Sequence, residues 1–195
     1  MWINSGDYPL LASSNTAGKS LDSAPPPAGI LGDMQIRDAT PDDWPSIWPF
    51  LREIVAAGET YTYPRDITEQ RARQIWLPAP PGRTVAAVGA DGTVVGSAKL
   101  GPNQLGPGSH VANASFMVAP HAAGRGVGRA LGRHVLDLAR AEGYRAMQFN
   151  AVVASNHRAV ALWRSLGFAV VGRVPEAFRH PTEGYVDLLV MHQRL

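Results

Sequence analysis

Short runs of alternating hydrophobic and polar residues fill much of the chain, and segments with a helical period separate them. The alternation predicts strands at 34–37, 84–88, 93–100, 110–118, 146–152, 169–174 and 185–193. A period of three to four residues predicts helices at 40–57, 68–77, 127–140 and 156–166. The order βααβββαβαββ favours an α/β protein in which one twisted mixed sheet of about seven strands is flanked by about four helices.

Turn and cap residues set several of these boundaries. Thr40-Pro41 is typical of a helix start, and Gly58 ends the same helix. Thr68 is a candidate N-cap for the second helix. Asp91-Gly92 predicts a tight hairpin between the strands on either side of it.

Residues 1–33 differ from the rest, because they are polar, include Pro25-Pro26-Pro27 and show no periodicity. We expect a flexible leader, or a start codon assigned too early, ahead of a domain at 34–195. The alternative is an arm that packs on the domain or on a neighbour through residues such as Trp2 and Tyr8.

Composition narrows the class of protein. A chain of 195 residues with 45% hydrophobic and 17% charged residues fits one globular domain. The formal charge is only +2 and the basic residues are scattered, so nucleic-acid binding is not predicted. The absence of cysteine excludes disulfides and a cysteine nucleophile and fits a reducing cytoplasm. We see no membrane span and no signal peptide.

The segment with the clearest chemistry reads VAPHAAGRGVGRAL, from Val118 to Leu131. A predicted strand ends there, three glycines alternate at 124, 126 and 128, and a helix begins. Free N–H groups at a helix start attract anions, and glycines let a ligand approach the backbone, which suits a pyrophosphate. The segment is neither a P-loop nor a dinucleotide fingerprint in its usual place. On this segment alone, a turn without a ligand remains an alternative.

A second segment, Asn156 to Phe168, reads NHRAVALWRSLGF. In this order the two segments resemble the GCN5-related N-acetyltransferase (GNAT) family, which has V-x-P, then R/Q-x-x-G-x-G/A opening a helix, then N-x-x-A-x-x-L-Y-x-x-L-G-F. The resemblance covers 34–195 in element order and is specific over 113–168. It implies the GNAT fold, with acetyl-CoA as co-substrate.

The resemblance also assigns a donor site. It places the pantetheine arm along the backbone of Met117 and Val118, the pyrophosphate on the amides of Gly124, Arg125, Gly126, Val127, Gly128 and Arg129, and the thioester end near Asn156 and Trp163. Two residues depart from the family pattern: Ala123 stands in the Arg/Gln place, and Trp163 in the place of a frequent Tyr acid. An indole N–H cannot protonate a leaving thiolate, so we expect Trp163 to pack rather than react.

Two asparagines mark the expected acceptor site. Asn113 and Asn150 lie in mid-strand among apolar neighbours, where an unpaired amide costs stability. They are either satisfied core amides or substrate ligands, and their place on both sides of the predicted cleft favours the second. With Phe116, Asn156 and Trp163 they resemble the azetidine-2-carboxylate acetyltransferases, in which the amides hold a cyclic imino acid and the ring at the Phe116 place packs on it. Asn113 and Asn156 are our catalytic candidates.

A neighbouring loop offers a different comparison. Glu59-Thr60 resembles the substrate loop of phosphinothricin- and methionine-sulfoximine-type acetyltransferases, and Tyr61 and Tyr63 form either a lid or ordinary packing. Those enzymes often have Glu where this chain has Asn113. An amide cannot act as a base, so deprotonation would fall to water or to the neutral fraction of the amine.

The predicted function is therefore direct transfer of acetyl from acetyl-CoA to the amine or imine of a small amino acid, in a ternary complex. The alternatives are phosphinothricin- or methionine-sulfoximine-type acetylation, and a non-catalytic acyl-CoA sensor. A protein amine is less favoured, since no acidic groove is evident. A homodimer is possible, and no metal is predicted, because His110, His157 and His180 lack ligand spacing.

Overall fold

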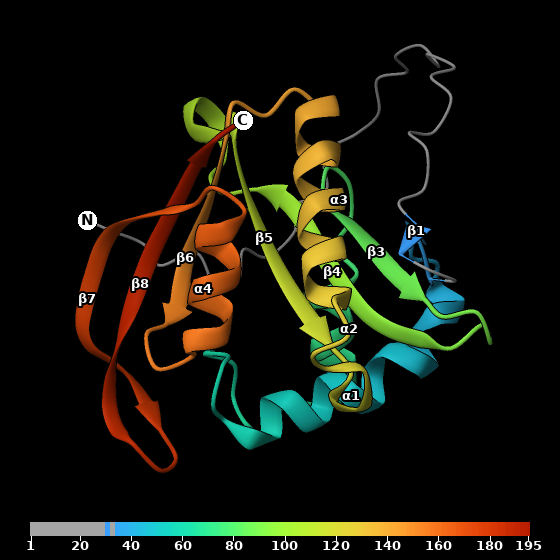
Figure 1. Ribbon diagram of the computed structural model, residues 1–195, viewed down its shortest axis with the longest axis horizontal. Coiled ribbons are helices and arrows are strands. Elements are labelled where there is room, and N and C mark those ends of the chain that lie inside the picture. Colours follow the sequence, from blue (N-terminus) through green and yellow to red (C-terminus); the bar gives the residue numbers. More distant parts are fainter. Residues whose placement is uncertain (1–29, 32–33) are drawn as a thin grey trace.

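One mixed sheet forms the centre of the molecule (Figure 1). The computed structural model describes residues 30–31 and 34–195. The strands are β1 (Ile30–Leu31), β2 (Met34–Asp38), β3 (Arg83–Val88), β4 (Val94–Pro102), β5 (Val111–Val118), β6 (Ala146–Val153), β7 (Ala169–His180) and β8 (Gly184–Arg194). Their order across the sheet is β1-β2-β3-β4-β5-β6-β8-β7.

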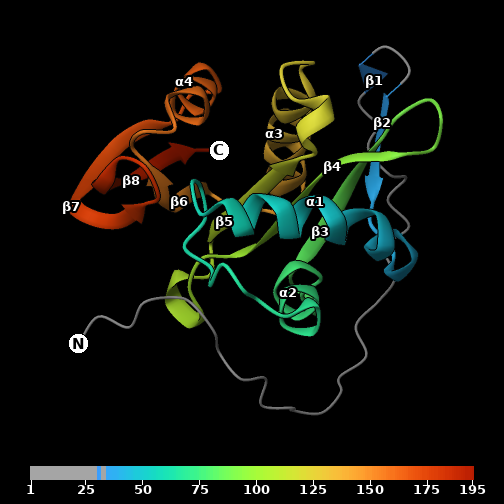
Figure 2. The same cartoon turned by 90° about the horizontal axis from the view of Figure 1, so that it is seen from below.

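Four helices cover the two faces of this sheet. They are α1 (Trp44–Ala57), α2 (Glu69–Trp76), α3 (Val127–Ala141) and α4 (His157–Ser165). Seen from below, α1 and α2 lie on one face and α3 and α4 on the other (Figure 2). None of the helices among these residues is long and apolar enough to cross a bilayer. The predicted α/β fold class is confirmed.

Two strands differ from the prediction. The two-residue β1 pairs with β2, so the described sheet has eight strands rather than about seven. Our expectation for the leader otherwise falls on 1–29 and 32–33, outside the described residues. β7 continues to His180, beyond the predicted end at Val174. An edge strand tolerates Pro175, and a bulge with Glu176 at φ 52° absorbs the irregularity.

The start of α1 shows how proline shapes a helix end. An α-helical bond to the carbonyl of Pro41 would need an N–H at Pro45, which proline lacks. The N–H of Trp44 bonds that carbonyl instead, so residues 41–43 form a 3-10 turn and α1 begins at Trp44 rather than at Thr40. The helix ends at Gly58 with φ 72°, as predicted.

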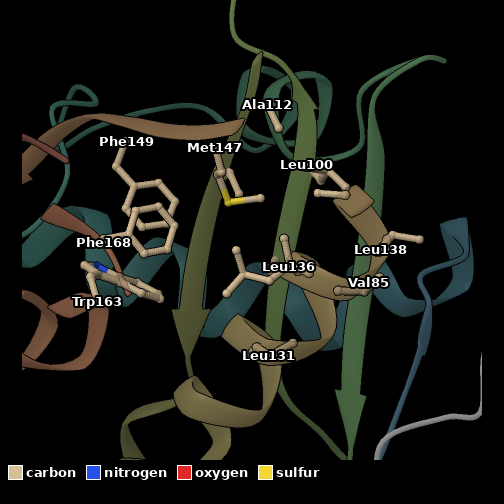
Figure 3. Close-up of a cluster of buried hydrophobic side chains, with 14 of the residues drawn as sticks. Val85, Leu100, Ala112, Leu131, Leu136, Leu138, Met147, Phe149, Trp163 and Phe168 are labelled. Carbon is tan, nitrogen blue, oxygen red and sulfur yellow. The ribbon is translucent and has the colours of Figure 1, made fainter. Parts of the chain in front are cut away.

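The core has two layers, one on each side of the sheet. In the larger layer, side chains of β3 to β6 pack against α3 and α4, and Phe149, Trp163 and Phe168 form an aromatic group (Figure 3). In the other layer, α1 and α2 pack on Ala86 and Met117. Since side chains alternate along a strand, odd-numbered residues of β5 face α1 and α2, and even-numbered ones face α3 and α4.

The sheet opens between β5 and β6. β5 pairs with β4 from Ala112 to Val118. Its parallel pairing with β6 covers only Val111 with Ala146 and Ala112 with Met147. Beyond these residues the strands diverge and leave a gap, named here the β5–β6 gap. Every feature of the candidate site lies around it.

Candidate active site

The backbone of Phe116 faces the β5–β6 gap. Tyr61 Oη donates to the Phe116 carbonyl at 2.6 Å and accepts from its N–H at 3.2 Å. Hydrogen-bonding direction alternates along a strand, so Val118 also faces the gap, whereas Met117, paired with Ser97, faces β4. This corrects the expected pantetheine contacts: the backbone of Val118 faces the gap, that of Phe116 is already bonded to Tyr61, and that of Met117 faces β4.

A chain of amides spans the same gap. Asn113 Nδ2 donates to the Gln148 carbonyl on β6 at 2.8 Å. Gln148 Nε2 donates to Asn150 Oδ1 at 2.8 Å, and Asn150 Nδ2 donates to Asn103 Oδ1 at 2.7 Å. Both predicted asparagines are thus paired, as mid-strand amides must be. The pairing fixes their orientation and uses only the NH2 group of Asn113, so its oxygen remains as an acceptor.

The glycine turn forms an anion cradle at the start of α3. Gly124 and Gly126 have φ of 79° and 86°, which side-chain-bearing residues rarely adopt. The first bond of the helix runs from the Ala130 N–H to the Gly126 carbonyl at 3.0 Å. The N–H groups of residues 127–129 precede that bond and therefore have no acceptor within the helix. N–H groups of this kind at a helix start suit the phosphate groups of a ligand.

Asn156 and Trp163 have clear structural roles in α4. Asn156 is the N-cap, and its Oδ1 accepts from the Ala159 N–H at 3.1 Å, which leaves its Nδ2 outside the cap. Trp163 is 7% exposed and lies 4.7 Å from Phe116 and 4.9 Å from Phe149 between ring centroids. This burial agrees with packing and offers no acid.

A cavity of about 1000 Å³ joins these features. Most of the predicted site residues line it, namely Tyr61, Tyr63, Asn113, Phe116, Met117, Val118, Gly124, Gly126, Val127, Gly128, Arg129, Asn150, Asn156 and Trp163. Glu59 and Arg125 do not, and both are exposed. Glu59 directly follows Gly58, whose left-handed backbone turns the chain, and the next residue, Thr60, is the first of this loop to line the cavity. Arg125 lies at the tip of the turn between the left-handed Gly124 and Gly126.

The sheet divides the cavity into two sides. On the donor side lie α3, α4 and the even-numbered residues of β5, and the Phe116 ring packs there against Trp163. On the acceptor side lie Asn113, Ser115 and Asn150, with α2 and the 60–64 loop. The expected pocket of two asparagines and one ring is therefore split, because Phe116 belongs to the opposite face from Asn113.

Three cations at the cavity were missed by sequence reasoning: Arg71, Lys99 and Arg158. Lys99 lies on β4 opposite Ser115, and its Nζ donates to the Ile75 carbonyl of α2 at 3.2 Å. The residue's place in an alternating strand was visible, but its position beside the cavity depends on strand register and on α2. No local signal could have found it.

Protonation at the gap is set by burial. Burial raises the pKa of Tyr61 far above the ordinary range of a phenol, and the nearby Tyr63 raises it further. Tyr61 Oη therefore keeps its proton and acts as a donor.

In the described part of the chain, no three His, Asp or Glu side chains gather as a metal site. A second hollow of about 830 Å³, between α1 and residues 119–121, contains none of the predicted residues.

Together, fold and site define a group-transfer protein with a phosphate cradle on one face of a split sheet and an amide-lined chamber on the other. Residues 48–168 match the model of the Acetyltransferase (GNAT) family, and the chain belongs to this family. It is a GNAT N-acetyltransferase.

Three relatives illustrate the range of similarity. A GCN5-related N-acetyltransferase from Kribbella flavida is 60% identical, with a TM-score of 0.81 over 84% of this chain and 98% of that one. N-acetyltransferase aca1 of Schizosaccharomyces pombe is 29% identical over 157 residues, 72% of this chain and 75% of the relative. The putative acetyltransferase YncA from Salmonella typhimurium, solved with its cofactor acetyl-CoA, is 25% identical, with a TM-score of 0.70 over 84% of this chain and 95% of that one.

Proposed function

We propose that this enzyme acetylates the amine or imine of a small amino acid, with acetyl-CoA as donor, by direct transfer in a ternary complex. One observation carries the proposal: a single cavity connects the glycine cradle with the amide-lined chamber through the β5–β6 gap. Direct transfer requires both substrates to meet within about 3 Å. A gap with one substrate on each side allows this contact without a covalent enzyme intermediate.

The donor side holds and orients the co-substrate. When bound, acetyl-CoA supplies an acetyl thioester, whose acyl carbon gains the bond to nitrogen and loses the bond to sulfur. The amides of residues 127–129 bind the pyrophosphate, and Arg129 and Arg158 add positive charge. The gap-facing backbone of Val118 and the free Nδ2 of Asn156 bind the amides of the arm.

The acceptor side positions the amine and manages the proton. Asn113 Oδ1 accepts from the attacking N–H group, and Asn150 limits the space beside it. Water receives the proton of the amine, because neither asparagine can act as a base. Water protonates the leaving thiolate, since Trp163 cannot, and the one proton of Tyr61 is held by its raised pKa and donated to the Phe116 carbonyl.

The structure weakens both of the acceptor classes that the resemblance implied. Glu59 lies outside the cavity, which weakens the likeness to the phosphinothricin and methionine-sulfoximine loop. Phe116 lies on the donor face, which weakens the likeness to the azetidine-2-carboxylate pocket. Asn113 and Asn150 share the acceptor side, and they favour a small, compact acceptor such as a cyclic imino acid.

The test is a panel of acceptors assayed for release of free thiol from acetyl-CoA. It includes azetidine-2-carboxylate, 4-hydroxyproline, methionine sulfoximine and phosphinothricin. We expect turnover with at least one. If acetyl-CoA raises the melting temperature but no acceptor releases thiol, the protein is a sensor and the proposal is wrong.

A pair of variants separates the two sides. Asn113→Ala is expected to lower kcat/KM for the acceptor about tenfold or more, the cost of one hydrogen bond to a charged or reacting group. Its affinity for acetyl-CoA should stay within about twofold. Asn156→Ala is the matched control, with weaker binding of acetyl-CoA. Equal loss of both properties in Asn113→Ala would show that the acceptor chamber is misplaced.

We also propose a homodimer in the cytoplasm. The outer edge of β7 closes the described sheet, and Val171, Val174 and Tyr185 are exposed on the β7–β8 hairpin. An apolar edge of this kind pairs readily with a second copy. Light scattering after size exclusion tests the state, and a monomer at micromolar concentration would refute it.

A further inference from the structure

The charged side chains around the cavity are all positive, on the donor side and on the acceptor side alike. The residues that line it include four cations, Arg71, Lys99, Arg129 and Arg158, and within the described lining no Asp or Glu. Arg129 on α3 and Arg158 on α4 belong to the donor side, where phosphates account for them. Arg71 and Lys99 lie across the sheet, on the side that receives the acceptor.

Strand register puts Lys99 beside the attacking position. Lys99 pairs with Ser115 on β5, and the next residue in phase, Asn113, pairs with Gly101. Paired residues share one face of a sheet, so Lys99 and Asn113 emerge on the same side, two residues apart along neighbouring strands. A small acceptor held by Asn113 therefore has Lys99 within its own length.

Surrounding groups hold the ammonium of Lys99 in place. Its Nζ bonds the Ile75 carbonyl at 3.2 Å and lies 6.0 Å and 5.9 Å from the ring centroids of Tyr63 and Trp76. The carbonyl and the two ring faces attract the ammonium group and restrict its motion. Arg71, one turn earlier on the same helix α2 as Ile75, brings a second positive group to that wall.

We infer that Lys99, supported by Arg71, binds the anionic group of the acceptor, a carboxylate next to the amine. This inference rests on the proposed function and deepens it. It limits the acceptors to amino or imino acids with a free carboxylate. Polyamines, lysine side chains and basic peptides are disfavoured, since each would bring positive charge against Lys99 and Arg71.

The test compares each accepted amino acid with its methyl ester, which keeps the amine and removes the charge. The wild-type enzyme should prefer the acid by about tenfold or more in kcat/KM, the range of one charge-assisted hydrogen bond. Lys99→Met should lose most of this preference, mainly through KM, whereas Lys99→Arg should retain much of it. Melting curves confirm that each variant folds.

Arg158→Met is the matched control, because it removes a cation from the other side of the same cavity. It should weaken coenzyme A binding and leave the ratio of acid to ester unchanged. A readout without turnover is calorimetric binding of the N-acetylated amino acid, which Lys99→Met should weaken and Arg158→Met should not.

The outcomes separate the two proposals. If no amine is acetylated, the proposed function is wrong. If amines are acetylated but the wild-type enzyme uses acid and ester equally, or if Lys99→Met keeps the full preference and binds the product as tightly, the acceptor proposal stands and the carboxylate inference is overturned.

Discussion

Two glycines one turn apart on α3 should respond in opposite ways to an added methyl group. At Gly128 a Cβ would lie 3.5 Å from Leu162 Cδ2 and 3.7 Å from Val118 Cγ2, which are ordinary contacts. Gly128→Ala should therefore keep or raise the free energy of unfolding, by about 0.5 kcal/mol, since alanine favours a helix. In a chain of this size that is about 1–2 °C in Tm.

The same methyl should damage donor binding. It would project between Val118 and Leu162, which both line the cavity, and stand beside the amides that hold the pyrophosphate. Loss of one charge-assisted hydrogen bond costs about 1.5–3 kcal/mol, so we expect the affinity for coenzyme A to fall about 10- to 100-fold.

Gly132→Ala is the control. Its methyl would lie 2.6 Å from Leu166 Cδ1 and 3.3 Å from Trp163 Cζ3, so the Leu166 side chain must shift and the Trp163 ring must give slightly. We expect a loss of about 1 kcal/mol in stability after the gain in helix propensity, with little change in affinity. Differential scanning fluorimetry without ligand gives the stability, and calorimetry gives the affinity for coenzyme A. A Gly128→Ala protein that binds coenzyme A as tightly as wild type would refute the cradle.

Two further predictions concern a hydroxyl and a carboxylate. Tyr61→Phe should lower kcat about tenfold, because it removes the two hydrogen bonds that fix the Phe116 backbone at the gap. Tyr63→Phe, on the stacked ring 5.5 Å away, should lower it far less, and equal effects would contradict this role. Because the pKa of Tyr61 is raised, its loss of a proton should not lower activity as pH rises towards 10. The Arg37 guanidinium lowers the pKa of the buried Asp43 from 3.8 to about 2. This lowered pKa contributes about 2 kcal/mol to the free energy of unfolding above pH 4, and the contribution should be lost as the pH falls towards 2. Urea unfolding should show Asp43→Asn weaker than wild type at pH 6 and equal to it near pH 2; a constant difference would contradict this.

Local patterns were sufficient for most of the fold. Gly58 ends α1 in a left-handed conformation, and Thr68 begins α2 as an N-cap whose side chain accepts a backbone hydrogen bond, both as predicted. The strand at β7 was predicted, but its end was placed too early, at Val174 before Pro175. Only the sheet shows that this strand lies at an edge, where a proline removes no hydrogen bond to a neighbour. β1 is too short for any periodic pattern.

The site was predictable where it depends on backbone or on a motif, and less so where it depends on register. The glycine cradle and the Asn156 cap follow from local sequence. The position of Lys99 beside the cavity, and the fact that Phe116 lies on the opposite face of the sheet from Asn113, depend on the register of β4 with β5 and on the packing of α2. No short sequence segment encodes either. The sequence placed Asn113 and Asn150 beside one cleft, but not the Gln148 and Asn103 amides that orient them.

The division of the cavity by the sheet has a consequence for how acceptor preference can change. The cradle, Asn156 and the aromatic group reside on α3, α4 and one face of β5, whereas α2, the 60–64 loop and the other face of β5 surround the acceptor. Substitutions in this second set leave the donor half of the core untouched, and distant sites contribute to stability nearly additively. New acceptors could therefore be explored by varying α2 and its loop alone, in evolution or in the laboratory, while the use of coenzyme A is inherited unchanged.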